Sequence, residues 1–262
     1  MRLLIHRNYD DACCWIADYI IGRIKAFAPS KEKPFVMALP TGSSVLGVYR
    51  ELISAFKEGR ISFSNVVSFS LDEYLGLDGD HPQSYKRFMK DNFFNAVDIL
   101  PENTHIPNGM SSDPEGECLI YEAKIKSHGG IELFMGGVGV NGHIAFNEPG
   151  TSLSSRTSVQ SLALDTVTAN ARFFEGDMGK VPVKALTMGI GTIMDSREVL
   201  IIASGRQKAA AIKAAVEGAL SHWWPLSCIQ MHPRAIIVCD EEAAEELKYS
   251  TVRYYKQIEG LD

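Results

Sequence analysis

Short apolar runs of strand length alternate along this chain with segments of helical periodicity, and this alternation restricts the fold more than any other feature. The runs lie at residues 35–39, 66–69, 131–135, 199–203 and 235–238. They are almost continuously apolar, which is typical of strands that are covered on both faces of a parallel sheet. Apolar residues at helical spacing accompany them at residues 12–27, 45–56 and 212–220, and Asp113-Pro114 begins a further helix.

Strands that alternate with helices predict an α/β protein. We expect a doubly wound, mostly parallel sheet with helices on both faces, similar to a Rossmann fold. The 262 residues contain no internal repeat, charge block or linker rich in proline and glycine, so a single domain over residues 1–262 is expected. The segment from about 141 to 181 has weak periodicity and many small polar residues, and we expect it to form a lid.

Composition excludes several classes of partner. Subtracting 26 Lys and Arg from 32 Asp and Glu leaves a net charge of −6, which gives no electrostatic footprint for nucleic acid or an anionic membrane. No signal peptide is apparent in residues 1–30, and no uncharged apolar run approaches the ~20 residues that a membrane span needs. The five cysteines form no C-x-x-C motif, so we expect them to be reduced and mostly buried in a cytoplasmic protein.

Loops that follow the strands are the first candidates for a site, because ligands of open parallel sheets bind beyond the carboxyl ends of the strands. The first loop, residues 40–44, offers three hydroxyls and the backbone N–H groups of a helix start, which suit a phosphate. It lacks the Lys-Ser/Thr pair of a Walker A loop, which disfavours an NTPase. An ordinary capped helix remains the alternative interpretation.

Cations near a second helix start support an anion site. Arg206 and Lys208 follow the run at residues 199–203, where the helix dipole disfavours positive charge by about 0.3–1 kcal/mol. A bound anion would offset this penalty, although Lys208 could also be simply solvated. Arg172, in the polar segment, is a second candidate for the same anion. By contrast, the acids at residues 240–242 are expected to begin a helix, as stability alone would prefer.

A glycine-rich run follows the apolar residues 131–135 and contains G-x-G-x-x-G at Gly137, Gly139 and Gly142. A dinucleotide fingerprint must open a long helix, but Pro149 interrupts the segment, so no nicotinamide cofactor is expected. The same loop holds Asn141, His143 and Glu148, which suit acid–base chemistry.

Two further interpretations concern the remaining polar residues. Asp72 and Glu73 lie at a strand end and are better general-base candidates than the other six histidines, which we expect to be structural or exposed. A metal site is not expected, because neither an H-E-x-x-H motif nor a second close histidine is present.

Eight strings in order along the chain resemble glucosamine-6-phosphate deaminases (isomerising), of the glucosamine/galactosamine-6-phosphate isomerase family. They are LPTGSS, SLDEYLGL, HPQSY, GGVGVNGHIAFNEPG, SLSSRT, ANARFF, KALTMGIGTIMDS and SGRQKA. The resemblance runs from Met1 to about Tyr255. The wider superfamily includes 6-phosphogluconolactonases, but the GHIAFNEP string is typical of the deaminases.

The resemblance implies an enzyme, a hydrolase of a cyclic amino sugar phosphate, that converts D-glucosamine 6-phosphate into D-fructose 6-phosphate and ammonium in N-acetylglucosamine catabolism. It implies that Asp72 moves a proton between C2 and C1, that His143 opens the sugar ring, and that Asn141 and Glu148 control His143. The residues that it places on the substrate are Gly137 and, around the phosphate, Thr41, Gly42, Ser43, Ser44, Arg172 and Lys208. It implies no cofactor or metal, and it favours a homo-oligomer, in particular a hexamer.

Two departures from the family pattern carry their own expectations. Many members have Asp where this chain has Asn141; an amide can accept a hydrogen bond from His143 but cannot stabilise an imidazolium by charge, so we expect slower or pH-shifted ring opening. In allosteric members a basic pair binds the phosphate of N-acetylglucosamine 6-phosphate between subunits. The positions implied for that site here are Thr151, Ser158, Gln160, Ser161 and Tyr254, with Ser158 and Gln160 in place of the cations. We therefore expect little activation.

Two alternative functions stay open at the level of sequence. A non-catalytic sugar-phosphate sensor would keep the phosphate residues but would not need Asp72 or His143. A lactone hydrolase of the 6-phosphogluconolactonase kind would need a base and a water molecule rather than enolisation.

Overall fold

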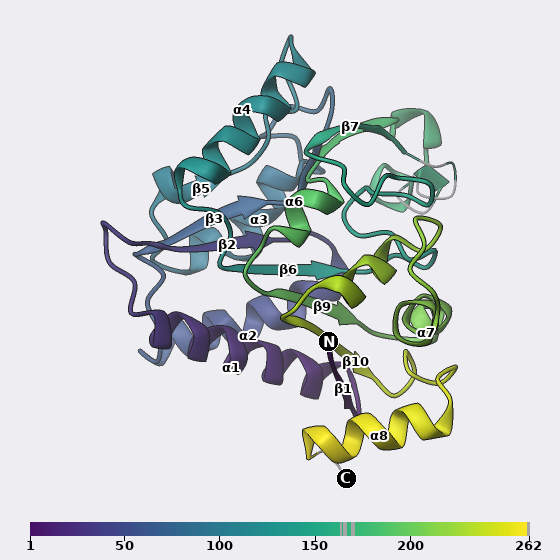
Figure 1. Ribbon diagram of the computed structural model, residues 1–262. Coiled ribbons are helices and arrows are strands. Elements are labelled where there is room, and N and C mark those ends of the chain that lie inside the picture. Colours follow the sequence, from purple (N-terminus) through teal and green to yellow (C-terminus); the bar gives the residue numbers. More distant parts are fainter. Residues whose placement is uncertain (163, 165–166, 169–170, 261–262) are drawn as a thin grey trace.

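A seven-stranded, wholly parallel sheet forms the centre of the computed structural model, which describes residues 1–162, 164, 167–168 and 171–260 (Figure 1). Its strands, in the order β1-β10-β9-β6-β2-β3-β5, are β1 (Arg2–His6), β10 (Ala235–Asp240), β9 (Val199–Ala203), β6 (Leu133–Gly137), β2 (Phe35–Leu39), β3 (Val66–Ser70) and β5 (Thr104–His105). The predicted α/β class with a mostly parallel sheet is confirmed.

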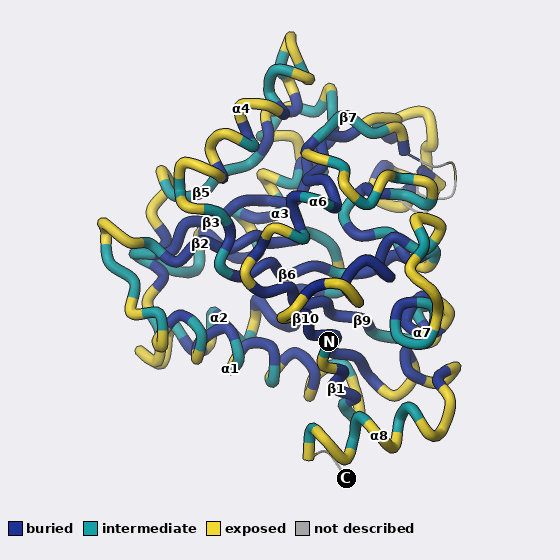
Figure 2. Tube along the Cα trace, in the orientation of Figure 1, coloured by how far each residue is buried: buried dark blue, intermediate teal, exposed yellow. Residues whose placement is uncertain are grey.

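Helices cover both faces of this sheet, as the sequence predicts. On one face lie α1 (Tyr9–Phe27), α2 (Leu46–Lys57) and α3 (Tyr85–Asn92); on the other lie α4 (Pro114–Ser127), α6 (Ile190–Met194), α7 (Ala209–Glu217) and α8 (Tyr249–Glu259). Successive residues of a strand point to opposite faces, so Ile201 joins one apolar cluster and Ile202 the other. Figure 2 shows the consequence: the strands are buried along their length, whereas the helices are exposed on their outer sides.

Local sequence signals fix several helix starts. The side chain of Asn8 caps α1 by accepting a hydrogen bond from the Asp11 N–H at 2.9 Å. Asp113 does the same for α4, through the Gly116 N–H at 3.0 Å, and Pro114 occupies the first helical position. The helix that the sequence predicts to begin at Pro114 is therefore present.

A second, three-stranded antiparallel sheet was not predicted. It consists of β4 (Asp72–Tyr74), β8 (Lys184–Thr187) and β7 (Ser158–Ser161), in the order β4-β8-β7. Strands of three or four residues are too short to show a period in the sequence. Tyr74, Phe146 and Phe174 form the centre of an apolar cluster on this sheet.

The predicted lid segment, residues 141–181, contains β7 and the short 3-10 helices η4 (Ala171–Phe173) and η5 (Met178–Lys180). Residues 163, 165–166 and 169–170 of that segment lie outside the described residues. Elsewhere, 3-10 turns lie at η1 (Ser43–Val45), η2 (Phe94–Ala96), η3 (Pro101–Asn103), η6 (Arg206–Lys208) and η7 (Pro225–Met231).

One predicted helix start is wrong. Asp240 is the last residue of β10, and residues 241–246 form turns instead of a helix. The Asp240 carboxylate accepts hydrogen bonds from the neighbouring loop after β9, including the Gly205 N–H at 3.0 Å. These acids therefore do not stabilise the N-terminus of a helix.

Among the described helices, none has both the length and the apolar character that crossing a membrane requires.

Candidate active site

The order in which successive strands are added to the sheet reverses between β2 and β6. From β2 it proceeds outwards to β3 and β5, and then returns to the other side of β2 to add β6, β9 and β10. This is the order of a doubly wound dinucleotide-binding sheet, with β1 added at one edge, and ligands of such sheets bind where the order reverses. The four adjacent strands β3, β2, β6 and β9 bring the loops with the predicted site residues to one edge.

The loop after β2 holds the predicted phosphate-binding residues Thr41, Gly42, Ser43 and Ser44. Gly42 has φ +105°, a conformation that L side chains rarely adopt, and it turns the chain into η1. Tyr9, which the sequence did not single out, supports this loop: its hydroxyl donates to the Ser43 carbonyl at 3.4 Å and accepts from the Gly47 N–H at 2.8 Å. The loop is therefore held in place from α1 while Ser43 stays exposed.

The two predicted phosphate-binding cations, Lys208 and Arg172, lie near each other. Lys208 is half-buried, and its pKa is lowered from the usual value, first by burial and then by the positive charge of Arg172. In the described part of the chain, neither side chain forms an ion pair with a carboxylate. The two positive charges therefore lie close enough to repel each other, and no described carboxylate neutralises them. A bound anion would stabilise this arrangement.

Arg206 does not belong to this pair of cations. Its exposed guanidinium forms an ion pair with Glu245, in the turn after β10. Glu245 thus already offsets part of the charge of Arg206, and this makes Arg206 a weaker candidate for the anion than Lys208. Lys208 is the remaining cation of the loop after β9.

Asp72, the predicted base, lies in β4 directly after the loop that follows β3. Its side chain is buried, with only 6% of the residue exposed. Burial raises the pKa of Asp72 to about 8, and the negative charge of Glu73 contributes further. A carboxyl group whose pKa lies near the working pH is suited to both accepting and returning a proton.

Glu73 has a different environment although it is adjacent. Its carboxylate accepts hydrogen bonds from the backbone N–H groups of Tyr74 at 2.9 Å, Tyr85 at 3.0 Å and Lys86 at 2.9 Å. Two of these donors belong to the first turn of α3, so Glu73 anchors that helix to β4. Burial raises the pKa of Glu73, and the three N–H groups act in the opposite direction.

The loop after β6 brings together Asn141, His143 and Glu148. Nδ1 of His143 lies 3.4 Å from Oε2 of Glu148, an ion-pair distance when the imidazole is protonated. The Asn141 amide nitrogen donates to the same carboxylate oxygen at 2.7 Å. The Asn141 carbonyl oxygen accepts from the backbone N–H of His143 at 3.2 Å, not from its ring. The expected amide–imidazole hydrogen bond is therefore absent, and Asn141 acts on Glu148 instead.

Glycines shape the turn that presents His143. A Cβ at Gly139 would lie 2.2 Å from Cε1 of the His143 ring, so the imidazole packs directly against this glycine. Gly142 has φ +82°, and a Cβ there would lie 2.8 Å from the Trp224 ring. Residues 138–150 form turns, bends and a bridge and do not open a helix, as the sequence predicts.

Two residues that the sequence did not single out fix the far end of the same loop. Asn147 is fully buried, and its amide nitrogen donates to the carbonyls of Ile144 at 2.9 Å and Met188 at 2.8 Å. Thr187 of β8 accepts a hydrogen bond from the Phe146 N–H at 3.1 Å, and it pairs with Asp72 across the antiparallel ladder. No sequence signal reveals these contacts, because they depend on the unpredicted second sheet.

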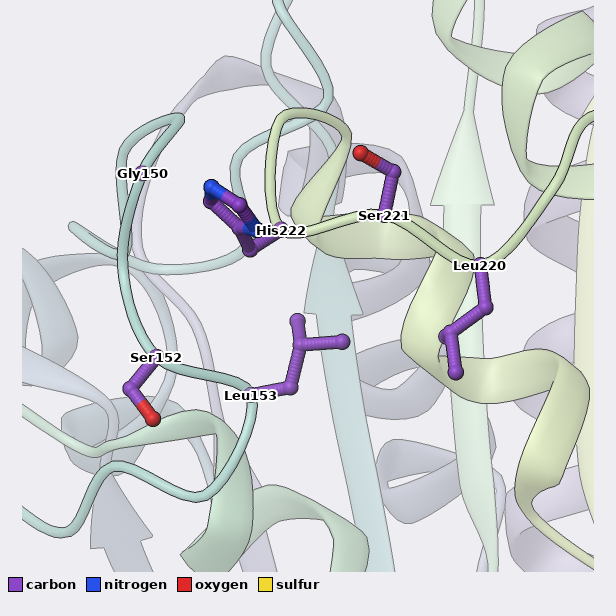
Figure 3. A pocket seen from close by; sticks show the side chains of 6 residues that line it. All are labelled: Gly150, Ser152, Leu153, Leu220, Ser221 and His222. Carbon is purple, nitrogen blue, oxygen red and sulfur yellow. The ribbon is translucent and has the colours of Figure 1, made fainter.

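Gly137 ends β6 at the same edge of the sheet, with no atom within 4 Å of the position that a Cβ would occupy. Next to the His143 loop, an open hollow of about 500 Å³ lies between residues 150–153 and 220–222 (Figure 3). The two segments are joined by a hydrogen bond from the Gly150 N–H to the His222 carbonyl at 2.9 Å. Because no atom lies within 4 Å of the Cβ position of Gly137, space is left open at the switch point, where the predicted substrate would lie.

The predicted allosteric residues do not gather in one place. Ser158 and Gln160 lie on β7, where the Gln160 amide donates to the Ser158 hydroxyl at 2.9 Å, and Ser161 ends the strand. Thr151 donates its N–H to the Glu148 carbonyl at 3.0 Å. Tyr254 is exposed on α8, which Figure 1 shows at the opposite end of the molecule from β7. A site that includes Tyr254 and β7 would need residues from two subunits.

The cysteines and possible metal ligands give two further results. All five cysteines are unpaired and four are buried, as predicted. Burial raises the pKa of Cys13 and Cys118 to about 11 and that of Cys228 to about 12, so these thiols are poor nucleophiles. In the described ranges, His, Cys, Asp and Glu form no group of three that could hold a metal ion.

A family profile described as glucosamine-6-phosphate isomerases/6-phosphogluconolactonase matches residues 8–238. The chain belongs to this family. It is 56% identical to the glucosamine-6-phosphate deaminase of Treponema denticola over 259 residues, which cover 99% of this chain and 96% of the relative. The deaminase of Proteus mirabilis is 52% identical over 262 residues, which cover 100% of this chain and 98% of the relative.

Solved structures of the family share the fold. A glucosamine-6-phosphate deaminase that is described as monomeric superposes with a TM-score of 0.86 at 40% identity, covering 94% of this chain and 99% of the other. The 6-phosphogluconolactonase of Thermotoga maritima reaches a TM-score of 0.71 at 20% identity, covering 92% of this chain and 99% of the other. The likeness to the lactonase shows the common fold, whereas the deaminases of Treponema denticola and Proteus mirabilis are identical to this chain at more than half of the aligned residues.

Proposed function

We propose that this chain catalyses the isomerising deamination of D-glucosamine 6-phosphate to D-fructose 6-phosphate and ammonium, in the breakdown of amino sugars. The observation that carries the proposal is a buried carboxyl group with a pKa of about 8, Asp72, at the same edge of the sheet as the loop that carries Lys208. Identities of 52–56% to deaminases over nearly the whole chain support it.

The phosphate would be held by the loop at residues 41–44 and by Arg172 and Lys208. The loop supplies hydroxyls and backbone N–H groups, and the cations supply charge that no described carboxylate neutralises. Gly137, with open space where a Cβ would lie, would leave room for the sugar.

Ring opening would depend on His143. It moves a proton from the anomeric hydroxyl to the ring oxygen, so the imidazole must accept a proton and then release it. The Glu148 carboxylate, 3.4 Å from Nδ1, would stabilise the imidazolium, while Asn141 holds the same carboxylate in place.

Isomerisation would then depend on Asp72. Its carboxylate removes the proton from C2 and returns it to C1, through a cis-enolamine. Water enters only when the resulting C2 imine releases ammonium. The defining chemistry is therefore proton transfer between neighbouring carbons, so isomerising deamination describes the reaction better than hydrolysis alone, and neither a metal nor an organic cofactor is needed.

We also propose a lid role for residues 141–181. Arg172 lies next to Phe173 and Phe174, and the Phe174 ring packs against Tyr74 of the strand that carries Asp72, with ring centroids 6.0 Å apart. Closure of this segment over the substrate would bring Arg172 to the phosphate and exclude water from Asp72.

Assembly and location are proposals as well. Five unpaired cysteines fit a reducing cytoplasm, and the distance between β7 and α8 fits a site that is completed by a second subunit of a homo-oligomer, with a hexamer favoured. Light scattering coupled to gel filtration would measure the mass; a monomer, like the related deaminase of solved structure, would contradict the oligomer.

The decisive experiment compares the wild type with Asp72→Asn. We expect the wild type to release ammonium and fructose 6-phosphate in equal amounts, and the variant to lose at least about 10³-fold in kcat while it still binds the substrate. A wild type that binds glucosamine 6-phosphate but releases neither product would support the sensor instead. Hydrolysis of 6-phosphogluconolactone by the wild type, but not of the amino sugar, would support a lactonase.

A further inference from the structure

Asp240 is a buried carboxylate that the proposed reaction does not use. It ends β10, the neighbour of β9, and only 5% of the residue is exposed. Its Oδ2 accepts a hydrogen bond from the Ser204 hydroxyl at 2.5 Å, and its two oxygens accept from the Gly205 N–H at 3.1 and 3.0 Å. The Ala243 N–H donates to Oδ1 at 2.8 Å. The carboxylate therefore joins the loop after β9 to the turn after β10.

Among the residues that the structure describes, no Lys, Arg or His forms an ion pair with this carboxylate. Three hydrogen-bond donors satisfy the carboxylate instead, two of them backbone N–H groups. Burying a charge is costly unless its hydrogen bonds are made, so these bonds hold both segments in one arrangement.

The loop that Asp240 holds leads directly to Lys208. Gly205 has φ +86°, which only glycine adopts without strain, and its N–H is directed at the carboxylate. The Gly205 carbonyl in turn accepts a hydrogen bond from the Lys208 N–H at 3.0 Å. Two successive hydrogen bonds thus connect the Asp240 carboxylate to the backbone of Lys208.

The turn after β10 also engages the other cation of this loop. Glu245 forms the ion pair with Arg206 on the surface. The turn consequently fixes the loop backbone through Asp240 and neutralises Arg206 through Glu245, while Lys208 is left unpaired beside Arg172. The arrangement presents one cation of the loop, rather than two, to an anion.

We propose that Asp240 is a positioning residue for phosphate: by fixing Ser204 and Gly205, its carboxylate holds Lys208 in the orientation that binds the phosphate group of the substrate. The inference rests on the proposed function only in taking Lys208 as a phosphate ligand. Asp240 itself would touch neither the substrate nor the reacting atoms.

The test is a double-mutant cycle that is read by binding, with inorganic phosphate as the probe. Dissociation constants are measured by calorimetry for the wild type, Asp240→Asn, Lys208→Ala and the double variant. If Asp240 acts through Lys208, Asp240→Asn alone should weaken phosphate binding about 5- to 20-fold but should add less than about 2-fold to Lys208→Ala. Multiplicative effects, an unchanged dissociation constant in Asp240→Asn, or no phosphate binding by the wild type would each overturn the inference.

Glu246→Gln is the matched control. Glu246 lies in the same turn and forms a long ion pair of 3.9 Å with Lys213, and among the described residues no hydrogen bond or ion pair joins it to residues 204–208. The control makes the same change in charge and should leave phosphate binding within about 2-fold of the wild type. If it weakens binding as much as Asp240→Asn does, general electrostatics explains the effect and the inference fails.

A milder variant covers the case in which Asp240→Asn does not fold. Ser204→Ala removes only the hydroxyl hydrogen bond to Asp240, in a half-buried loop. It should raise the dissociation constant for phosphate about 2- to 5-fold, and no rise would again contradict the inference. Phosphate binding does not require turnover, so a protein that binds phosphate as described but releases no ammonium would disprove the proposed deaminase and leave this inference intact.

Discussion

The Asn141 side chain donates a hydrogen bond to Oε2 of Glu148 at 2.7 Å, and this same carboxylate oxygen lies 3.4 Å from Nδ1 of His143. The amide therefore reaches the imidazole only through the carboxylate. The hydrogen bond from Asn141 therefore fixes the Glu148 carboxylate in the position where it faces the His143 ring. The effect of Asn141 on ring opening is indirect.

Replacing Asn141 with aspartate tests this relationship. The substitution places a second carboxylate beside Glu148 and adds a negative charge near the His143 ring, which favours a positively charged neighbour. The limb of the pH–rate profile that reports His143 should move to higher pH, with kcat changed by about 2- to 10-fold. The measurement is kcat against pH from about 5.5 to 9, and a profile that coincides with the wild type would contradict the interpretation.

Glu73→Gln probes the charge that acts on Asp72. Removing the negative charge of Glu73 lowers the pKa of Asp72, which burial and Glu73 together raise to about 8. The Asp72 limb of kcat/KM against pH should therefore shift to lower pH by roughly half a unit to one unit. The exposed acid Asp80 offers a matched control, and Asp80→Asn should leave that limb unmoved. A shift of equal size in both variants would show that long-range charge, rather than the adjacent carboxylate, sets the value.

Asp72→Asn should make the folded protein more stable at alkaline pH. The folded-state pKa of Asp72, about 8, lies above the usual value of 3.8, so the folded protein binds the proton more tightly than the unfolded chain. The free energy of unfolding therefore falls as the pH rises from about 4 to about 8, and an amide, which never ionises, avoids this loss. Urea unfolding at pH 5 and pH 9 should show a larger gain for the variant at pH 9. An equal difference at both pH values would refute the raised pKa.

Sequence patterns predict five of the seven strands of the central sheet, because these five form apolar runs that are buried along their length. They miss β1 and β5, whose residues are partly exposed. The runs at residues 35–39 and 199–203 coincide with β2 and β9, and the helix beginning at Pro114 is present. The same reasoning fails for β4, β7 and β8, since three- and four-residue strands have no readable period and pair with partners far away in the chain.

The candidate site, like the fold, could be predicted only in part from the sequence. The loops with Thr41, Asp72 and His143 could be placed at one edge from the expected parallel sheet alone, because parallel strands bring their carboxyl ends together. The partners that orient them could not be predicted. Asn147 acts through buried contacts with distant carbonyls. The sequence predicts Asp240 at a helix start, although its carboxylate accepts hydrogen bonds from the loop that leads to Lys208.

Gly139→Ala should impair His143 without unfolding the protein. The new Cβ would lie 2.2 Å from Cε1 of the imidazole, so the ring must leave its place against the turn. A displacement of about 1 Å in a catalytic group can cost about 10²-fold in rate, and we expect a loss of 10- to 100-fold in kcat with KM changed less than about 3-fold. Gly22→Ala is the matched control, since nothing lies within 4 Å of its Cβ position in α1, and it should leave kcat unchanged while stabilising the helix by about 0.5–1 kcal/mol. An equally active Gly139→Ala would show that the packing of the ring on Gly139 does not position His143.

N-acetylglucosamine 6-phosphate should have little effect on the wild type. Positions 158 and 160 carry no charge, and the Gln160 amide and the Ser158 hydroxyl are hydrogen-bonded to each other at 2.9 Å, so neither offers a cation to a phosphate. Charged hydrogen bonds are roughly twice as strong as neutral ones, and losing two of them should weaken binding of the activator severely. We expect hyperbolic rate curves that 1 mM activator, taken as a roughly saturating concentration for a regulatory site, leaves within about 2-fold. Ser158→Arg combined with Gln160→Lys supplies the missing charge and should create measurable binding of the activator. Sigmoidal kinetics in the wild type that the activator makes hyperbolic would show that regulation survives without these cations.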